Sequence, residues 1–417
     1  MTSTGHVAPW LARLVREHRG RFDLPDLRIH PDDEMFRWSQ QHCPTPAIGE
    51  MAYFRAGMVI SDTLRDIAEQ WCASGPARLL DFACGYGRSL RFTIQDFGGD
   101  RVWGSEILPD AVAYIGDELG AHAVMSTTRP EELEIDGGFD VIFVSSLFSH
   151  LPERTFTPWL LELYRRLAPD GLLIFSVHDE LLLPNGAELS PAGIYFRPST
   201  EVEALDVQDY GATVVSEDFV SRAINIASGH DVYRRFPTAL CFEQDLYVVP
   251  ADRDADLRSL SVTHGPQGAI DGCHVEQGRI TAQGWAATQD PDVTVREVEI
   301  RIDGQLSART RPSESRSDVA ASAHAEADVR WTRSGWQATF DVPAGVEPNS
   351  VVTGTAQVTD GCRRIFWSSE LRELVPDEED ANPSTQEFRT KSSAERVTGF
   401  ARRAGRRLAR AFRSQSP

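Results

Sequence analysis

The sequence of 417 residues lacks most of the features that mark a specialised class of protein. Its six cysteines are scattered and none belongs to a C-x-x-C pair, so no zinc or other metal site is expected. No apolar run approaches the ~18 residues of a membrane-spanning helix, and the N-terminus carries no apolar core with a small-residue cleavage site. These absences favour a cytoplasmic protein with free thiols.

Positive charge is scarce everywhere except at the C-terminus. The formal net charge is −20, yet residues 389–417 contain nine Arg or Lys residues and a single Glu. An acidic body argues against a broad nucleic-acid surface, so no nucleic-acid partner is expected for it. Hydrophobic residues make up 41% and charged residues 25%, which is ordinary for a folded protein with sizeable cores.

Shifts in composition and periodicity divide the chain into five predicted parts. Residues 1–75 form an N-terminal helical cap with proline-rich joints. Residues 76–250 alternate between strands and helices, and residues 262–375 hold short alternating stretches typical of a β-sandwich. Residues 376–388 are an acidic, disordered linker by composition, and residues 389–417 form a basic amphipathic helix.

The second part predicts an α/β domain with a mostly parallel sheet, because short apolar runs alternate with helical stretches long enough for crossover connections. The expected helices of this region are 88–97, 109–119 and 154–167. Seven strands are expected, at 77–82, 102–106, 121–125, 139–145, 172–177, 212–216 and 239–249.

The pattern of apolar and polar residues changes in residues 262–375. Val293–Ile302 alternates apolar and polar residues and meets Asp303-Gly304, a strong hairpin signal. Further strands are expected at 338–342 and 351–358. We expect three tryptophans to supply the core of this sandwich, namely Trp285, Trp336 and Trp367.

A glycine loop follows the first predicted strand, in the run Leu79-Leu80-Asp81-Phe82-Ala83-Cys84-Gly85-Tyr86-Gly87-Arg88. Gly85 and Gly87 let the backbone approach a flat ligand closely. The dinucleotide fingerprint needs a third glycine three residues further on, and its absence argues against an NAD enzyme. The Asp81 carboxylate is poorly suited to phosphate but suits an ammonium and a sulfonium. Glu106, at the end of the second strand, suits the two hydroxyls of a ribose.

Four motifs in order resemble class I S-adenosylmethionine-dependent methyltransferases. They lie at 79–88, 102–106, 139–152 and 163–175. The resemblance implies a Rossmann-like fold with seven strands, S-adenosyl-L-methionine as cofactor, and an acceptor bound at the same sheet edge. It also implies cofactor contacts from the residues that stand at the motif positions, namely Asp81, Ala83, Gly85, Gly87, Glu106, Ile107, Ser126 and Ser145.

Two positions depart from the pattern of that family. Ala83 stands where many members have glycine, and its methyl group is tolerated there if the residue keeps a negative φ. Ser126 stands where an acid often reaches the adenine amine, and its hydroxyl is the expected substitute. Tyr53 and Gly57, on an expected helix over 47–72, either fold over the cofactor or pack that helix on the sheet.

Candidate general bases follow the fourth and fifth strands. His150 follows one, and His178-Asp179 follow the other, on the same edge of the sheet as the glycine loop. Histidine suits base work near neutral pH. A capping or structural role is the alternative for each of the three. Residues 195–197 are either walls of the acceptor site or loop anchors.

Looser resemblances concern the acceptor. Residues 244–247 and 52–57 resemble methyltransferases found beside glycosyltransferases in bacterial surface-glycan pathways, and residues 284–336 resemble a sandwich module of glycan-modifying enzymes. They imply O-methylation of a sugar, a glycan or a glycosylated small molecule in polysaccharide biosynthesis, with a glycosyltransferase as partner. The alternative is a methyltransferase-fold scaffold without activity, and an RNA methyltransferase is disfavoured by the acidic body.

The basic tail leaves three hypotheses open. Residues 389–417 bind an anionic membrane surface, dock on an acidic protein surface, or bind nucleic acid. The first two are favoured because an apolar stripe runs along the expected helix, formed by Val397, Phe400, Ala401, Ala404, Leu408, Ala411 and Phe412.

Overall fold

The computed structural model describes residues 9–19, 23–43, 45–199, 205–241, 243–290, 292–323, 325–347, 350–359, 361, 363–370 and 372–373. The predicted acidic linker and basic tail lie outside these residues. No helix of the described ranges is both long and apolar enough to cross a membrane.

The chain forms two compact units, and each is built from separate stretches of sequence. The described residues of the first lie within 24–42 and 53–263. Those of the second lie within 7–23, 43–52 and 264–373. The five-part division predicted from the sequence remains a prediction.

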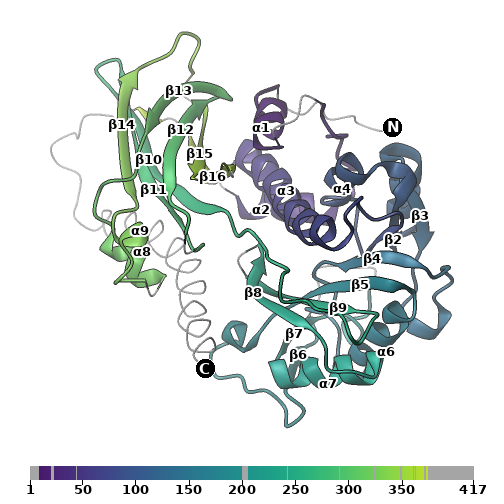
Figure 1. The fold of residues 1–417 in the computed structure, drawn as a ribbon. Helices are drawn as coiled ribbons and strands as arrows, with labels where there is room; N and C mark the ends of the chain where they lie inside the picture. Colours follow the sequence, from purple (N-terminus) through teal and green to yellow (C-terminus); the bar gives the residue numbers. More distant parts are fainter. Residues whose placement is uncertain are drawn as a thin grey trace. The chain divides into compact units, whose positions relative to one another are not determined.

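The first unit contains a seven-stranded sheet in the order β3-β2-β1-β4-β5-β9-β8 (Figure 1). The strands β1 to β5 run parallel to one another, and β9 runs antiparallel to both β5 and β8. The predicted Rossmann-like fold with a mostly parallel sheet of seven strands is thereby confirmed. Its strands are β1 Leu79–Phe82, β2 Val102–Glu106, β3 His122–Met125, β4 Phe139–Val144, β5 Leu167–Val177, β8 Arg234–Leu240 and β9 Gln244–Pro250.

Helices cover both faces of this sheet, because side chains of the central strands alternate between two buried clusters. Leu79 and Val141 belong to one cluster, and Leu80 and Ile142 belong to the other. Helices α6 and α7, which lie side by side in Figure 1, pack on the second cluster. The helices of the unit are α2 Glu34–His42, α3 Pro46–Trp71 from Tyr53 onward, α4 Leu90–Phe97, α5 Pro109–Tyr114, α6 Glu153–Tyr164 and α7 Glu217–Ser228, with short helical turns η1 Gly99–Arg101, η2 Ile115–Leu119, η3 Pro130–Glu132 and η4 Glu180–Leu182.

Two of the predicted strands differ from the structure. The stretch 212–216 forms β7 Ala212–Val215, which pairs with β6 Ile194–Arg197 in a separate hairpin and does not join the main sheet. The stretch 239–249 is divided into the end of β8 and β9, because the chain reverses between Leu240 and Gln244. Cys241 has a φ of 53° there, and because no glycine stands at this position the turn has no local sequence signal.

The second unit contains two four-stranded sheets that are mostly antiparallel, in the orders β14-β11-β10-β17 and β13-β12-β15-β16. The hairpin expected at Asp303-Gly304 is confirmed, with φ values of 48° and 74°. Trp285 and Trp336 are buried as predicted, whereas the Trp367 side chain lies outside the described residues. The elements are β10 Pro266–Glu276, β11 Arg279–Thr288, β12 Val295–Ile302, β13 Gln305–Thr310, β14 Gly335–Asp341, β15 Val351–Val358, β16 Arg363–Glu370, β17 Arg372–Glu373, α8 Ser317–Ser322 and α9 Val329–Thr332.

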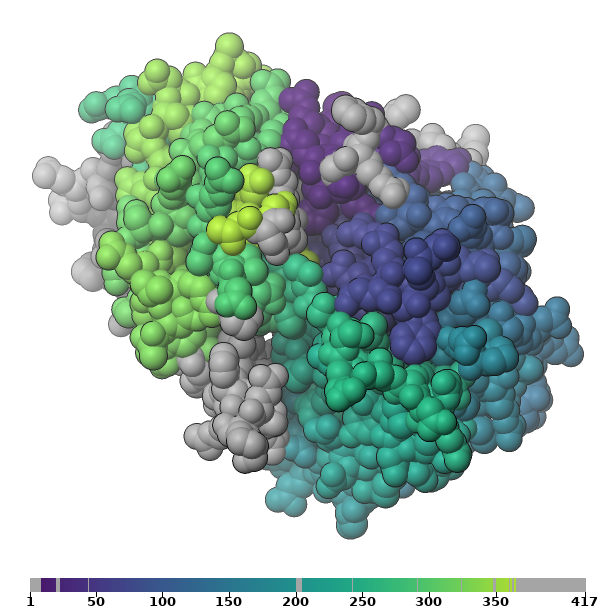
Figure 2. All heavy atoms as spheres, in the orientation of Figure 1, coloured from purple at the N-terminus to yellow at the C-terminus, as the bar shows by residue number. Residues whose placement is uncertain are grey.

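The first helix of the chain, α1 Pro9–Arg19, belongs to this second unit. Arg301 of β12 is nearly buried and forms an ion pair of 2.6 Å with Glu17 of α1. A Cβ atom on Gly304 would lie 2.8 Å from the carbonyl oxygen of Trp10, so the β12–β13 turn touches the helix directly. In Figure 2 the strands of this unit appear as green atoms and α1 as dark purple atoms.

Candidate functional site

The carboxyl ends of β1, β2, β4 and β5 meet at one edge of the first unit's sheet, because these strands are parallel neighbours. In open α/β sheets this edge is where ligands bind. The candidate cofactor residues follow β1 and β2, and the candidate bases follow β4 and β5.

The glycine loop after β1 turns sharply back towards β2. The amide nitrogens of Ala83 and Cys84 both donate to the carbonyl oxygen of Ser105, at 2.8 and 3.2 Å. Ala83 adopts a φ of 60°, so the condition of a negative φ is not met. Folding both amides onto one carbonyl requires this left-handed conformation, which costs a residue with a Cβ atom about 1–2 kcal/mol.

The two glycines of the loop have different surroundings, so a side chain would have a different effect at each. Both have positive φ, 57° for Gly85 and 75° for Gly87. A Cβ atom on Gly87 would lie 2.4 Å from a methyl carbon of Leu119, so a side chain here would displace Leu119. A Cβ atom on Gly85 would meet no atom within 4 Å, so the backbone at Gly85 faces open space.

Asp81 ends up buried on β1, with 1% of its surface exposed. Its Oδ2 accepts a long hydrogen bond of 3.5 Å from Ser89, and its Oδ1 has no hydrogen-bond partner among the described residues. Burial is the main cause that raises the pKa of the Asp81 carboxyl to about 7; the Ser89 hydrogen bond opposes the rise and the nearby Glu106 adds to it. Such a carboxyl is poised to bind a cation.

Glu106 lies at the end of β2 and is held by two backbone amides. Its Oε2 accepts from Gly85 at 2.8 Å, and its Oε1 accepts from Ile107 at 2.7 Å. Burial raises the pKa of the Glu106 carboxyl, while these amides act against the rise. The amide of Ser126 donates to the Glu106 carbonyl oxygen at 2.7 Å, which places Ser126 next to the end of β2; its contact with adenine remains a prediction.

A polar cluster that sequence reasoning missed follows β4. Ser145 and Ser146 come directly after the strand, and Ser146 has a φ of 67°. The Ser146 amide donates to the Ser176 hydroxyl at 2.8 Å. The side chain of Gln244 on β9 forms hydrogen bonds with the hydroxyls of Ser146 and Ser176. No local signal could reveal this cluster, because Gln244 is distant in sequence.

His150 is fixed by its neighbours. Its ring stacks on Tyr210 with centroids 4.5 Å apart, and its Nδ1 lies 2.6 Å from the carbonyl oxygen of Gly211. A carbonyl can only accept a hydrogen bond, so Nδ1 carries the proton and Nε2 of the neutral ring is the acceptor. The β6–β7 hairpin, which contains residues 195–197, therefore lies beside His150.

His178 lies close to His150, with ring centroids 6.5 Å apart. Its Nε2 is 3.4 Å from the side-chain nitrogen of Gln244, which has only hydrogens to offer. The contact therefore requires an unprotonated Nε2 on His178. The structure brings the two candidate histidines together, each with a ring nitrogen able to accept a proton.

Asp179 points into an ion-pair cluster. Its Oδ1 accepts from the Leu181 amide at 2.8 Å, and its Oδ2 lies 3.2 Å from Arg235. Arg235 also pairs with the fully buried Asp245 at 2.6 Å and with Glu217. These contacts are those of a cap and an anchor for β8, which was the alternative role considered for Asp179.

Tyr53 and Gly57 both lie in α3 and are packed against protein atoms. The Tyr53 hydroxyl donates to Asp33 at 2.5 Å, and burial is the main cause that raises its pKa. A Cβ atom on Gly57 would lie 2.2 Å from the carbonyl oxygen of Arg88, so this glycine lets α3 approach the glycine loop. Their cofactor contact remains a prediction.

The residues present fit S-adenosylmethionine on three observations. The unpartnered Asp81 Oδ1 matches an amino group, Glu106 is held at the end of β2 where a ribose would bind, and the backbone at Gly85 is open. The described residues hold no group of three or more His, Cys, Asp or Glu side chains that could bind a metal ion.

Comparison with known proteins agrees with this site. Residues 80–173 match the model of a family described as a methyltransferase domain. No curated protein matches the chain. Residues 80–173 therefore match a methyltransferase domain, and the fit of the sheet-edge residues to S-adenosylmethionine agrees with that match.

Several solved structures resemble the chain at low identity. They include 1,6-didemethyltoxoflavin-N1-methyltransferase of Burkholderia thailandensis with bound S-adenosylhomocysteine, at 18% identity over 48% of this chain and 78% of that chain, with a TM-score of 0.33. An S-adenosylmethionine-dependent methyltransferase of Clostridium acetobutylicum shares 14% identity over 46% and 90%, with a TM-score of 0.32. The mitomycin 7-O-methyltransferase MmcR shares 16% identity over 52% and 60%, also with a TM-score of 0.32. Likeness at these levels says nothing about the acceptor.

Proposed function

We propose that this methyltransferase domain transfers a methyl group to a hydroxyl of a sugar, in a glycan or a glycosylated small molecule of bacterial surface-polysaccharide biosynthesis. The observation that carries the proposal is the pairing of cofactor and base residues on one sheet edge. Asp81 lies on β1 and Glu106 at the end of β2, while His150 and His178 follow β4 and β5.

In this mechanism the bound cofactor supplies an electrophilic methyl group, and the chain mainly aligns the reactants and excludes water. Asp81 Oδ1 holds the amino group of the cofactor, and Glu106 accepts from its ribose hydroxyls. His150 or His178 accepts the proton of the acceptor hydroxyl. His150 uses Nε2, because its Nδ1 donates to the Gly211 carbonyl oxygen, whereas Nε2 of His178 must first give up its contact with Gln244. The hydroxyls of Ser146 and Ser176 supply further polar contacts for a sugar.

The acceptor is tested by transfer of labelled methyl groups from S-adenosylmethionine to extracts of surface-polysaccharide precursors. We expect label in the glycan fraction with the full chain, and none with an Asp81→Asn variant. Label that appeared only in RNA or protein would overturn the sugar assignment.

The alternative is a scaffold that has the fold without the activity. Titration with S-adenosylhomocysteine separates the two hypotheses, since a scaffold that has lost the cofactor would give neither heat nor a thermal shift. The intact Asp81, Gly85, Gly87 and Glu106 support the enzyme.

We propose further that residues 389–417 bring the enzyme to the cytoplasmic face of a membrane or to a glycosyltransferase partner. Nine basic residues beside an apolar stripe suit an anionic lipid surface. Sedimentation with vesicles containing phosphatidylglycerol, compared with neutral vesicles, tests the lipid arm. Binding that persisted after removal of residues 389–417 would contradict it.

A further inference from the structure

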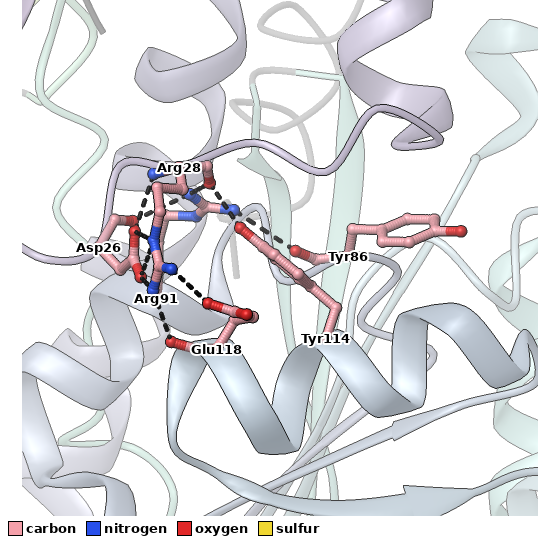
Figure 3. A network of polar contacts seen from close by, with 6 residues as sticks. All are labelled: Asp26, Arg28, Tyr86, Arg91, Tyr114 and Glu118. Atoms are coloured by element: carbon pink, nitrogen blue, oxygen red, sulfur yellow. Dashed lines mark hydrogen bonds and ion pairs between the residues drawn. The ribbon is translucent and has the colours of Figure 1, made fainter. Parts of the chain in front are cut away.

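The segment 24–33, here called the strap, has no regular secondary structure but is fastened to the glycine loop through Arg91 of α4. The Arg91 side chain is buried, and its Nη1 donates to the carbonyl oxygens of Asp26 and Arg28 at 2.9 and 2.6 Å. Figure 3 shows the guanidinium between the strap and the loop.

The same guanidinium binds the glycine loop. Its Nε donates to the carbonyl oxygen of Gly87 at 3.0 Å, and its Nη2 donates to that of Tyr86 at 3.4 Å. These two carbonyls flank the positive-φ turn at Gly87, so Arg91 fixes the peptide units on both sides of it. One side chain thus holds four carbonyls, two in the strap and two in the loop.

We propose that Arg91 is a positioning residue through which the strap holds the glycine loop in its cofactor-binding conformation. The inference rests on the proposed function, because it assumes that the loop binds S-adenosylmethionine. Five N–H donors in a rigid fork allow arginine to serve both segments at once, whereas lysine offers three donors from one nitrogen.

The strap and the glycine loop are coupled, because separating either one from Arg91 costs free energy. If the strap lifted away, two buried donors of Arg91 would lose their acceptors, and an unpaired donor of a buried charged group is costly. Arg91 would then keep its two bonds to the loop and a longer one, of 3.5 Å, to the Tyr53 hydroxyl. The coupling is therefore a property of the shared guanidinium.

Further contacts fasten the strap to the same part of the unit. The hydroxyl of Tyr114 donates to the Arg28 carbonyl oxygen at 2.7 Å, and the Arg28 guanidinium pairs with Glu118. The ring of His30 stacks on Tyr86, with centroids 4.7 Å apart. Tyr86, which stands between the two glycines of the loop in the sequence, thus contacts the strap through its ring.

The test compares the full chain with Arg91→Lys and Tyr114→Phe. Phenylalanine keeps the ring of Tyr114 and removes only the hydroxyl that binds the strap. Tyr164→Phe is the matched control, because the Tyr164 hydroxyl also donates to backbone carbonyls, those of Pro250 and Ala251, away from the loop. Amide hydrogen exchange of residues 24–33 and 83–91 is measured without ligand, and the Kd of S-adenosylhomocysteine is measured by calorimetry.

We expect Arg91→Lys to speed exchange in both segments and to weaken S-adenosylhomocysteine binding roughly tenfold, as loss of charge-assisted hydrogen bonds implies. Tyr114→Phe should loosen the strap, and through it residues 83–91, with binding weakened about threefold. Tyr164→Phe should change none of these quantities.

The inference is overturned if Tyr114→Phe loosens the strap while exchange of residues 83–91 and the Kd stay as in the unaltered chain. If the unaltered chain binds no S-adenosylhomocysteine, the proposed function fails instead. Exchange of residues 83–91 in the ligand-free variants then still decides whether the strap holds the loop.

Discussion

Single residues define the candidate site, and Asp81 is the most informative of them. Its carboxyl is buried with one oxygen unpartnered, an arrangement that costs stability in the free protein. Its pKa of about 7 in the folded protein exceeds the ordinary value of about 4, so the unfolded chain releases this proton first. Its contribution to stability is therefore lost as pH rises from about 4 to 7.

Asp81→Asn should raise the melting temperature of the ligand-free protein at pH 8, and the gain should shrink as the pH is lowered towards 4. The same change should weaken S-adenosylhomocysteine binding roughly 10–100-fold, because an amide offers no charge to the ligand's amino group. Scanning calorimetry and titration calorimetry from pH 5 to 8 check both effects.

Asp140→Asn is the control for that pair of measurements, because the Asp140 carboxylate binds the amides of Ala77 and Arg78 before β1 begins. It should lower stability and leave the Kd unchanged. An Asp81→Asn variant with unaltered affinity would refute the cofactor assignment.

The two histidines give a second prediction. His178→Gln or His150→Gln should lower kcat by about 10²–10⁴-fold for whichever ring is the base, with the acceptor KM and the Kd of S-adenosylhomocysteine nearly unchanged. His122→Gln, on β3 with its ring stacked on Trp103, is the control and should keep full kcat. Initial rates on the labelled acceptor measure this, and full activity in both test variants would exclude histidine as the base.

Arg91 and Gln244 show why part of the site escaped prediction at the residue scale. Asp81, Gly85, Gly87 and Glu106 lie in local motifs, and sequence reasoning named them. Arg91 acts on Asp26, 65 positions away, and Gln244 acts on Ser146, 98 positions away. Such contacts are fixed by the tertiary fold and leave no local pattern.

At the scale of elements, the pattern of apolar residues was sufficient wherever a strand or helix had a clear end. The central strands β1, β2 and β4 were predicted within two residues at each end, because buried apolar runs stop at polar or glycine residues. Strand β5 begins earlier than predicted and passes through Pro169-Asp170-Gly171, which resembled a helix stop. Sheet pairing overrode that local signal.

The β12–β13 turn allows a test of contact between elements. Gly304→Ala should destabilise the second unit more than Gly345→Ala does, by about 1 kcal/mol or more. Both glycines have positive φ, 74° and 82°, so both variants incur the same backbone strain. Only at Gly304 would the new methyl group meet another element, at Trp10 of α1, whereas nothing lies within 4 Å at Gly345. Urea unfolding measures the difference, and equal losses would show that α1 does not pack on this turn.

At the scale of the molecule, the two units do not follow the order of the chain. The second unit takes α1 from residues 7–23 and its sheets from residues after 264. Composition alone placed α1 in an N-terminal cap, because sequence shows that Leu11, Leu14 and Val15 share an apolar face but not what covers it.

A fragment that begins at residue 262 should therefore be less stable than the same strands in the full chain, because Arg301 and Gly304 lose α1. Adding a peptide of residues 7–23 should raise the melting temperature of the fragment in a concentration-dependent way. A peptide with Glu17→Gln and Trp10→Ala serves as the control. A fragment that gained nothing from either peptide would contradict the assignment of α1.

The pairing of Glu17 with Arg301 also bears on how the protein is made. The two residues lie 284 positions apart, so at ordinary ribosomal speeds roughly 15–60 s separate their synthesis. During that interval the apolar face of α1 has emerged while the strands it contacts do not yet exist. In the nascent chain the apolar face of this helix therefore lacks its partner strands while the first unit is synthesised. A chaperone that binds short apolar helices would meet an exposed face there.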